Sequence, residues 1–419
     1  MKQLITLKEA TSAFLSYSPP SLRKYDLDRM YQLMELLGNP QNKLRVIHVA
    51  GTSGKTSTSY FIRAMLEGAG QKTGLTVSPH ITGINERIQI GGLPLSEQKF
   101  LGYANQFFEL LAASEIKPTY FELLVAMAYW VFAKEKVDYA VVETGLGGLL
   151  DGTNVAGLPD KVCVITDIGL DHTEILGETL AEIAFQKAGI IHPHNTVFIH
   201  HQSAEIIDVV MQSAQKNMAN VHAVAETDGP QQLPLFQRRN WSLACAVFGF
   251  VCERDGLTMP QDLSGVTGQT PPGRWEQYCY NGKTIILDGA HNPQKLQALC
   301  DSMISSGKKR AAVMANFSEA PEAKIDAALR VLQPLAASLV VPEFSAGQDI
   351  KCRHSLASAQ LAARARALDF PDVHEQPDIF QAFLQLLESP EDVLLITGSL
   401  YLVSAVRPLV IKTLQNKEG

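Results

Sequence analysis

The chain has 419 residues, and this length predicts two domains rather than one core. Hydrophobic residues make up 46% of the sequence, as in a globular protein with ample material for buried cores. The formal net charge of −7 excludes a broad electrostatic attraction for nucleic acid, although a local basic pocket for an anionic small molecule stays possible.

Cysteine usage and hydropathy exclude other classes of protein. The six cysteines (163, 245, 252, 279, 300 and 352) form no Cys-x-x-Cys pair, so neither a zinc site nor a redox motif is expected. Free thiols in a reducing cytosol are the simplest interpretation. The N-terminus lacks a signal-type apolar block, and the longest apolar run, Leu123–Ala133, is too short to span a bilayer. We therefore expect a cytoplasmic protein without membrane or nucleic-acid partners, and a buried helix at Leu123–Ala133.

Strand-like and helix-like segments alternate along the first part of the chain. Fully apolar strands with helices between them are typical of a parallel sheet that helices cover on both faces. The strands are expected at Arg45–Ala50, Thr73–Val77, Tyr139–Glu143, Val162–Ile168 and Val197–His200. The helices are expected at Ser57–Gly68, Gln98–Ala113, Thr119–Lys134 and Thr179–Ala188. Ligands of such sheets bind at the carboxyl ends of the strands.

A second alternating series follows the punctuated stretch Thr270–Arg274. Its strands are expected at Thr284–Asp288, Ala311–Met314, Ser338–Val341 and Val393–Thr397. Glycine and proline together mark a turn or linker, so we place the boundary between residues 1–273 and residues 274–419. The predicted fold class is α/β, with a phosphate-loop domain and a smaller Rossmann-like domain, and a cleft between domains is the default place for a ligand.

Residues 48–57, His-Val-Ala-Gly-Thr-Ser-Gly-Lys-Thr-Ser, link the first strand to a helix. Such a turn directs backbone N–H groups and the helix dipole at an anion. Gly51 and Gly54 allow a close approach, Lys55 supplies a positive charge, and Thr56 supplies a hydroxyl that can reach Mg²⁺. The pattern predicts a nucleoside triphosphate site. The alternative is an ordinary glycine turn with a solvated Lys55, since Val49 stands where the full phosphate-loop pattern has glycine.

Two acidic or polar clusters follow other strands. Ser78-Pro79-His80 comes directly after a strand and has an equally good interpretation as a strand-ending loop. Glu143 ends an apolar strand, where a carboxylate is costly unless it meets a cation, and Mg²⁺ with nucleotide phosphates would supply one. The alternative is a glutamate that hydrogen-bonds loop backbone.

Three further positions have both a functional and a structural interpretation. His172, beside Asp171 after a strand, could bind metal or be a polar loop residue. Lys187 lies on a predicted helix and could be a plain surface lysine. Asp288, with Arg274, could contact a nucleotide, or Asp288 or Asn292 could cap the helix that begins near Pro293.

A set of motifs resembles one known family. The motifs HVAGTSGKTS, SPH, TYFE, ETGLGGLLDGTN, LDHTEILG, KAGI, PGR, DGAHNP and TGSLYLV are similar to those of folylpolyglutamate and dihydrofolate synthases, within the Mur-type amide ligases. They occur in the family's order from about Leu27 to Arg407. The resemblance implies an active site between the two domains, and a reaction in which ATP phosphorylates a carboxylate and L-glutamate then attacks the acyl phosphate.

The resemblance also implies roles for individual residues. Lys55, Lys187 and His291 would be catalytic, and Lys187 would be carbamylated. The remaining roles are nucleotide binding by Gly51, Thr52, Ser53, Gly54, Lys55, Thr56, Asn240, Arg274 and Asp288; substrate binding by Thr119, Tyr120, Phe121, Glu122 and Asp151; and metal binding by Ser78, Glu143, His172 and Thr56. ATP and Mg²⁺ are the implied cofactors, and a monomer acting on L-glutamate and dihydropteroate or a reduced folate is expected.

Departures from the family pattern concern the substrate side more than the ATP side. Ser53 and Thr56 replace the family's Asn and Gly, Leu149 replaces a basic residue, Gly152 an Ala, and Gln186 a Glu. A Mur-type ligase for a different carboxylate is therefore one alternative. A nucleotide-dependent switch protein without ligase activity is another, although the predicted phosphate and metal residues are all present.

Overall fold

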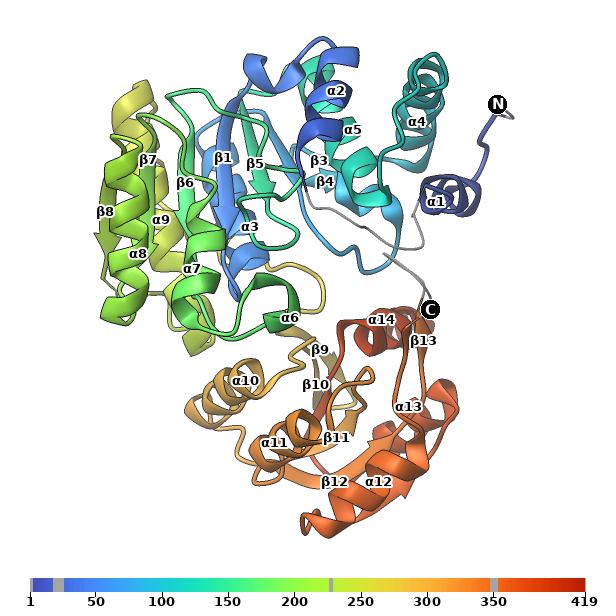
Figure 1. The fold of residues 1–419 in the computed structure, drawn as a ribbon. Coiled ribbons are helices and arrows are strands. Elements are labelled where there is room, and N and C mark those ends of the chain that lie inside the picture. Colours follow the sequence, from blue (N-terminus) through green and yellow to red (C-terminus); the bar gives the residue numbers. More distant parts are fainter. Residues whose placement is uncertain (1–2, 18–25, 226–228, 347–352, 419) are drawn as a thin grey trace. The chain divides into compact units, whose positions relative to one another are not determined.

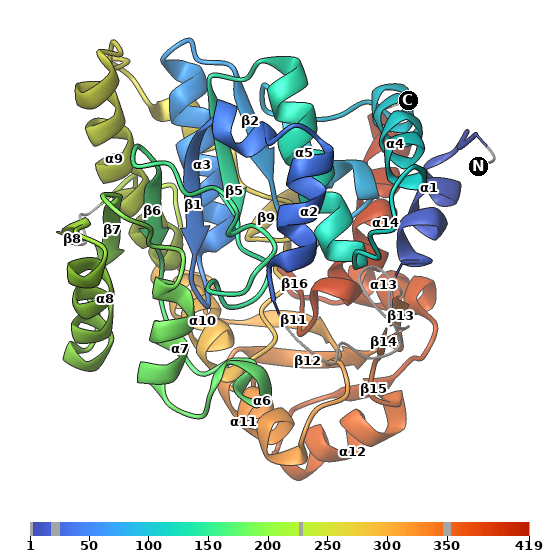
Figure 2. The same ribbon diagram turned by 45° about the horizontal axis from the view of Figure 1, so that its top comes forward.

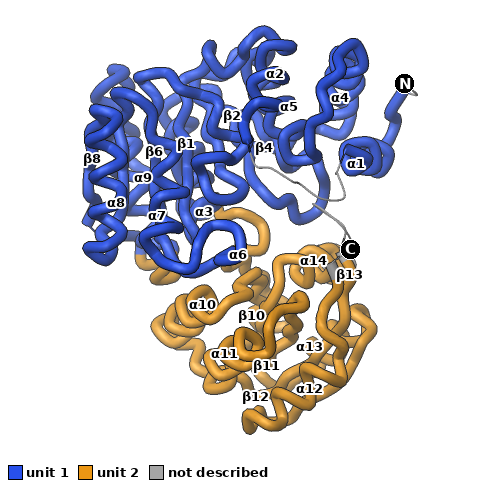
Figure 3. Tube along the Cα trace, viewed as in Figure 1, with its two compact units in different colours: residues 1–230, 237–269 blue, residues 231–236, 270–419 orange. Residues whose placement is uncertain are grey.

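The computed structural model describes residues 3–17, 26–225, 229–346 and 353–418 (Figure 1). The chain forms two compact units (Figure 3). Unit 1 comprises Met1–Pro230 and Gln237–Gln269, and unit 2 comprises Gln231–Phe236 and Thr270–Gly419. Among the helices of the described residues, none combines the length and the apolar character that crossing a bilayer requires. Cys352 lies outside the described residues.

The sheet of unit 1 has the strand order β4-β3-β2-β5-β1-β6-β7-β8, parallel from β2 to β8, with β3 and β4 antiparallel at one edge. Its strands are β1 (Arg45–Ala50), β2 (Thr73–Thr76), β3 (Gln89–Ile90), β4 (Leu93–Pro94), β5 (Tyr139–Glu143), β6 (Val162–Ile165), β7 (Thr196–His200) and β8 (Asn220–Val224). Its helices are α1 (Leu7–Leu15), α2 (Asp28–Leu36), α3 (Lys55–Gly68), α4 (Glu97–Ala112), α5 (Tyr120–Glu135), α6 (Thr173–Leu176), α7 (Leu180–Ala188), α8 (Ala204–Lys216) and α9 (Leu235–Asp255).

Helices cover both faces of this sheet because its strands are apolar on both sides. On one face, Val46 of β1 packs in a core with α2 and α5, and Ala50, four residues on, packs in a core with α7 and α8. On the opposite face lie α3 and α9 (Figure 2). Phe61 of α3 and Trp241 of α9 meet there edge to face, with ring centroids 5.3 Å apart. The apolar run at Leu123–Ala133 lies within α5, which is buried from Glu122 to Phe132, as predicted.

Unit 2 has a sheet of strand order β15-β12-β11-β16-β10-β9, parallel except for the β9–β10 pair. Its strands are β9 (Glu276–Tyr280), β10 (Lys283–Leu287), β11 (Ala311–Ala315), β12 (Ala336–Val341), β15 (Val373–Glu375) and β16 (Val393–Thr397), and a separate ribbon pairs β13 (Ser345–Ala346) with β14 (Arg353–His354). Its helices are α10 (Pro293–Ser305), α11 (Glu322–Leu332), α12 (Ser358–Ala367), α13 (Ile379–Glu388) and α14 (Leu400–Glu418).

The core of unit 2 follows the alternation of its strands. Val313 of β11 packs with α10, α11 and α12, and its neighbour Met314 packs on the other face with α13 and α14. Both units are therefore mostly parallel sheets between helices, which confirms the predicted α/β class.

Strand β6 differs from the prediction. The apolar pattern predicts a strand to Ile168, but β6 ends at Ile165, because Thr166 and Asp167 bond to the loop that follows β1 instead of continuing the ladder. The carboxyl ends of β2, β5, β1 and β6 lie side by side in the sheet, and every predicted phosphate or metal residue before Lys187 ends or follows one of them. After β1, the chain places β2 and β5 on one side of that strand and β6, β7 and β8 on the other. Open α/β sheets bind ligands where the strand order reverses in this way.

Candidate active site

The loop after β1 is held between two other segments. A Cβ atom on Gly51 would lie 1.8 Å from Thr166 Oγ1, and one on Gly54 would lie 2.3 Å from Asn240 Oδ1. Gly54 also has φ +87°, in the left-handed region. Both positions therefore require glycine, and Asn240 of α9 lies against the loop although the sequence separates them by 186 residues. The buried Gln237, on the same helix, donates to Ser57 Oγ at 2.9 Å.

Two lysines converge on this loop. Lys55 Nζ and Lys187 Nζ each donate to the carbonyl oxygen of Gly51 at 2.9 Å. Lys187 is 3% exposed, so its interpretation as a plain surface lysine is wrong. Two ammonium groups on one carbonyl concentrate positive charge beside the helix N-terminus, as an anionic ligand requires.

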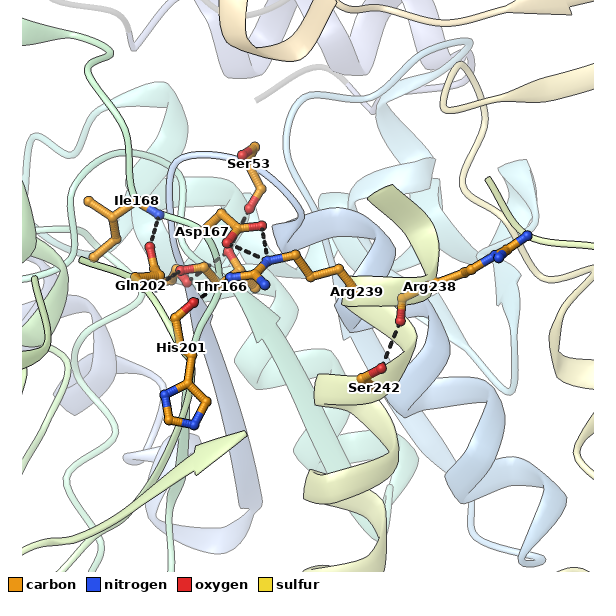
Figure 4. A network of polar contacts seen from close by, with 10 residues as sticks. Ser53, Thr166, Asp167, Ile168, His201, Gln202, Arg238, Arg239 and Ser242 are labelled. Atoms are coloured by element: carbon orange, nitrogen blue, oxygen red, sulfur yellow. Dashed lines mark hydrogen bonds and ion pairs between the residues drawn. The ribbon is translucent and has the colours of Figure 1, made fainter. Parts of the chain in front are cut away.

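A polar network fixes the same loop from the end of β6 (Figure 4). The amides of Thr52 and Ser53 donate to the carbonyl of Asp167 at 2.7 and 3.2 Å, and Thr166 Oγ1 donates to the Ser53 carbonyl at 2.7 Å. Arg239 Nε donates to Asp167 Oδ1 at 2.8 Å. Burial raises the pKa of Asp167, and Arg239 opposes that rise. Thr166, Asp167 and Arg239 were not predicted from the sequence. The first two could have been found from their place at the end of a buried strand, and Arg239 from its place next to Asn240, a predicted nucleotide contact.

Three of the four predicted metal ligands, Thr56, Ser78 and Glu143, lie together. Glu143 is 3% exposed; Thr56 Oγ1 donates to its Oε1 at 2.8 Å, and the Ser78 amide lies 3.4 Å from its Oε2. A buried carboxylate beside hydroxyl groups is an all-oxygen donor set that fits Mg²⁺, which is usually held by one or two carboxylates plus phosphates. Among the described residues no group of three or more His, Cys, Asp or Glu could hold a metal by itself. His172 lies at the N-cap of α6 with an exposed ring, 3.8 Å from Glu174.

The glycine-rich loop after β5 packs against the segment Thr119–Glu122. Asp151 is buried and accepts from the amides of Leu146 and Thr153 at 2.7 and 3.0 Å, and its burial raises its pKa. A Cβ atom on Gly145 would lie 2.4 Å from Phe121 Cζ. The two segments predicted to bind the substrate are therefore in direct contact.

Glu122 has structural partners that the motif did not reveal. It forms a capping box with Thr119 at the start of α5, and it accepts from Nε and Nη2 of Arg29 at 3.1 and 2.9 Å. Tyr120 is buried in the core between α2 and α5. Arg29 was missed because no local pattern signals its partner, 93 residues away.

Within unit 2, Asp288 organises the loop after β10. Its carboxylate accepts from the amides of Trp275 and Ala290 at 2.8 and 2.9 Å, and Arg274 lies close enough to oppose the rise in pKa that burial causes. Asn292, not Asp288, caps α10 by accepting from the Lys295 amide.

His291 has both ring nitrogens in polar contacts. Nδ1 donates to the carbonyl of Gly289 at 2.9 Å, and Lys295 Nζ donates to Nε2 at 3.2 Å. In these two contacts Nδ1 is the donor and Nε2 is the acceptor. Lys295 carries no signal in the sequence beyond its place one helical turn after His291.

Comparisons with known proteins show the family to which the chain belongs. Residues 49–241 match the Mur ligase middle domain, and residues 273–400 match the Mur ligase glutamate ligase domain. The "Dihydrofolate synthase/folylpolyglutamate synthase" of Bacillus subtilis is 31% identical over 92% of this chain and 94% of its own length. The folylpolyglutamate synthase of Mycobacterium tuberculosis complexed with ADP superposes with a TM-score of 0.81 at 27% identity, covering 96% of this chain and 98% of that one. A solved FPGS–AMPPCP–folate complex superposes with a TM-score of 0.78 at 27% identity, covering 97% and 100%. The chain belongs to the dihydrofolate synthase/folylpolyglutamate synthase family of Mur-type ligases.

Proposed function

We propose that this protein is an ATP-dependent ligase that adds L-glutamate to dihydropteroate, to reduced folates or to both, through an acyl phosphate. The observation that carries this proposal is the convergence of Lys55 and Lys187 on the Gly51 carbonyl, beside the buried Thr56–Glu143 contact. A carboxylate is a poor electrophile, and transfer of a phosphoryl group to it supplies the leaving group that amide formation needs. The relative named dihydrofolate synthase/folylpolyglutamate synthase and the solved folate complex support the substrate class.

The loop after β1 would hold the nucleotide. Residues 51–56 would hold the phosphates, and Lys55 would neutralise the charge that develops on the transferred phosphoryl group. Thr56, Ser78 and Glu143 would hold Mg²⁺, which would supply positive charge against the nucleotide phosphates when bound. His172 would hold a second ion. Asn240, Arg274 and Asp288 would contact the nucleotide, and the Asn240 contact with Gly54 supports this role.

The chain's own residues would then position the acceptor and the attacking amine. Phe121 and Asp151, which flank Gly145, would border the pterin-bearing substrate together with Thr119, Tyr120 and Glu122. Lys187, carbamylated, would become an anion that binds metal, and its burial beside Gly51 is consistent with a site closed to bulk water. His291, whose Nε2 accepts from Lys295, would act near the reacting phosphates.

The proposal also covers the domain boundary, the oligomeric state and the cellular compartment. We place the domain boundary between residues 273 and 274, with the glutamate ligase domain after it. We expect the protein to act as a monomer in the cytoplasm.

The direct test measures phosphate release from ATP with Mg²⁺ and L-glutamate, adding dihydropteroate or tetrahydrofolate in turn, with mass detection of the product. The expected result is release that needs both glutamate and a pterin, and a product that is one glutamyl unit heavier. Pterin-independent release, or none from protein that binds ATP, would contradict the folate assignment.

The metal assignment has its own test. Chelation of Mg²⁺ should abolish turnover, and Glu143→Gln should raise the Mg²⁺ concentration that gives half-maximal rate. Glu135→Gln is the matched control, because Glu135 ends α5 away from the loop and pairs with Lys72. Equal Mg²⁺ requirements in both variants would remove Glu143 from the metal site.

A further inference from the structure

A buried lysine outside the predicted site joins two segments that belong to it. Lys161, just before β6, is 1% exposed, and its Nζ donates to the carbonyls of Ala156 and Ile190 at 2.7 and 2.8 Å. Ala156 ends the glycine-rich loop that contains Asp151. Ile190 follows α7, three residues after Lys187. We call this pair of bonds the Lys161 bridge.

The two joined segments also touch through their backbones. A Cβ atom on Gly148 would lie 2.6 Å from the Gln186 carbonyl oxygen and 2.9 Å from that of Lys187. The Leu149 amide donates to the Gln186 carbonyl at 2.7 Å, and a Cβ on Gly189 would lie 2.5 Å from Leu149 Cα. A shift of either segment would therefore move the other.

A second buried side chain spans the same junction. Asn154 Nδ2 donates to the carbonyls of Leu149 and Gly189 at 3.1 and 2.9 Å, and its Oδ1 contacts His192 Nε2 at 2.9 Å. Asn154 thus binds one carbonyl from the glycine-rich loop and one from the end of α7. Lys161 does the same with carbonyls that lie later in each of the two segments. The repeated pattern shows that the junction is held at two points.

A buried lysine is energetically unfavourable at this position unless it gains specific hydrogen bonds. Burying an ammonium group costs free energy, and here two neutral carbonyls are the acceptors rather than a carboxylate. Consistent with this cost, burial lowers the pKa of Lys161 to about 8. Methionine has nearly the same length and would fill the space without a charge. What lysine adds is a pair of directed bonds between the loop and the end of α7.

We propose that Lys161 is a positioning residue that holds the glycine-rich loop and Lys187 in one fixed arrangement by bridging the Ala156 and Ile190 carbonyls. The catalytic consequence rests on the proposed function, since Lys187 acts there. The structural consequence, restricted motion of both segments, does not.

The test compares Lys161→Met with a matched control, Lys283→Met. Lys283 Nζ likewise donates to two carbonyls, those of Leu387 and Ser389, but in unit 2 at the end of α13. In Lys161→Met, amide exchange measured by mass spectrometry should accelerate about ten-fold or more in residues 145–156 and 186–191. Lys283→Met should leave both segments unchanged.

Steady-state kinetics separate positioning from general stability. Lys161→Met should lower kcat by about 10- to 100-fold, because Lys187 would be displaced, while the KM for ATP changes by less than about two-fold. Lys283→Met should change neither value. If Lys161→Met does not fold, Lys161→Gln, which keeps an uncharged donor, takes its place with the same expected directions.

Unchanged exchange in both segments of a folded Lys161 variant would overturn the proposal, as would an equal fall in kcat for Lys161→Met and Lys283→Met. If the wild-type protein shows no pterin-dependent turnover, the proposed function fails, and the exchange measurement still decides whether the Lys161 bridge restrains the two segments.

Discussion

The loop after β1 in unit 1 and the loop after β10 in unit 2 are each held by charged side chains, mainly lysines in the first and carboxylates in the second. In unit 1, side-chain donors bind carbonyl oxygens: Lys55 and Lys187 bind that of Gly51, and Thr166 binds that of Ser53. In unit 2, carboxylates bind amides instead. Asp288 accepts from Trp275 and Ala290, and Glu276 accepts from the Gly273 amide at 3.0 Å while Arg407 pairs with it through Nε and Nη2.

This difference has an electrostatic consequence. Cationic donors on the carbonyls of unit 1 leave positive charge beside the loop, which suits phosphate. Carboxylates on the amides of unit 2 need compensating cations, and Arg274 and Arg407 lie beside them. Two mostly parallel sheets therefore present loops of different charge, because the sheet fixes where a loop lies and side chains fix what it binds.

The largest expected effect tests the cationic side of the comparison. Lys55→Met should lower turnover by about 10²- to 10³-fold, because the positive charge that Lys55 would place next to the phosphates is lost. Lys55 is half-buried and its loss should leave the thermal transition nearly unchanged. ADP release and circular dichroism measure the two quantities. Turnover that stays near the wild-type value would show that unit 1 does not depend on the lysines that mark it.

The carboxylate side of the comparison is tested by Asp288→Ala. Two buried amides, those of Trp275 and Ala290, would lose their acceptor, at a cost of about 2–4 kcal/mol in stability. Hydrogen exchange should rise within unit 2 and not in unit 1. Asp288→Asn, which keeps one acceptor oxygen, should show a smaller change. Equal changes in both units would contradict a role confined to the unit 2 loop.

A buried cation in unit 1 also predicts a pH dependence. The pKa of Lys161 is about 8 in the folded protein against an ordinary 10.5, so between these values the unfolded chain holds the extra proton. The free energy of unfolding of the wild type should therefore rise with pH relative to Lys161→Met, by up to about 3 kcal/mol. Urea unfolding at about pH 7.5, 9 and 10.5, which together cover the window between the two pKa values, measures this difference. A difference that stays constant with pH would mean that Lys161 does not titrate there.

The smallest expected change in stability comes from Gly152 of unit 1, a position where the structure has room for a side chain. A Cβ on Gly152 would lie 3.5 Å from Met30 Cγ and 3.6 Å from Glu122 Cγ, which is ordinary contact. Gly152→Ala, the family's usual residue, should stabilise the protein by about 0.4–1 kcal/mol, measured by thermal unfolding. Gly148→Ala is the contrasting control and should destabilise it, because two backbone carbonyls block the added atom. Similar outcomes for both would contradict the tight junction at Gly148.

Several sequence predictions agree with the structure in detail. β1, β5 and β16 have the predicted bounds, and the apolar run of α5 is a buried helix. The β3–β4 pair, β8 and the helices α1, α2, α8 and α9 were not predicted. β8 is largely exposed and β3 and β4 have two residues each, so they carry little hydrophobic periodicity.

The sequence by itself determined the parallel α/β architecture, the turn from β1 into α3 and the family, because periodicity and short motifs are local properties of the chain. Only the tertiary structure decided that Lys187 is buried on Gly51, that Glu122 pairs with Arg29, and that Lys161 joins Ala156 to Ile190. The physical reason is separation along the chain. Lys187 and Gly51 are 136 residues apart, and their contact depends on strand order and on the close packing of glycine backbones, which no local pattern of side chains records.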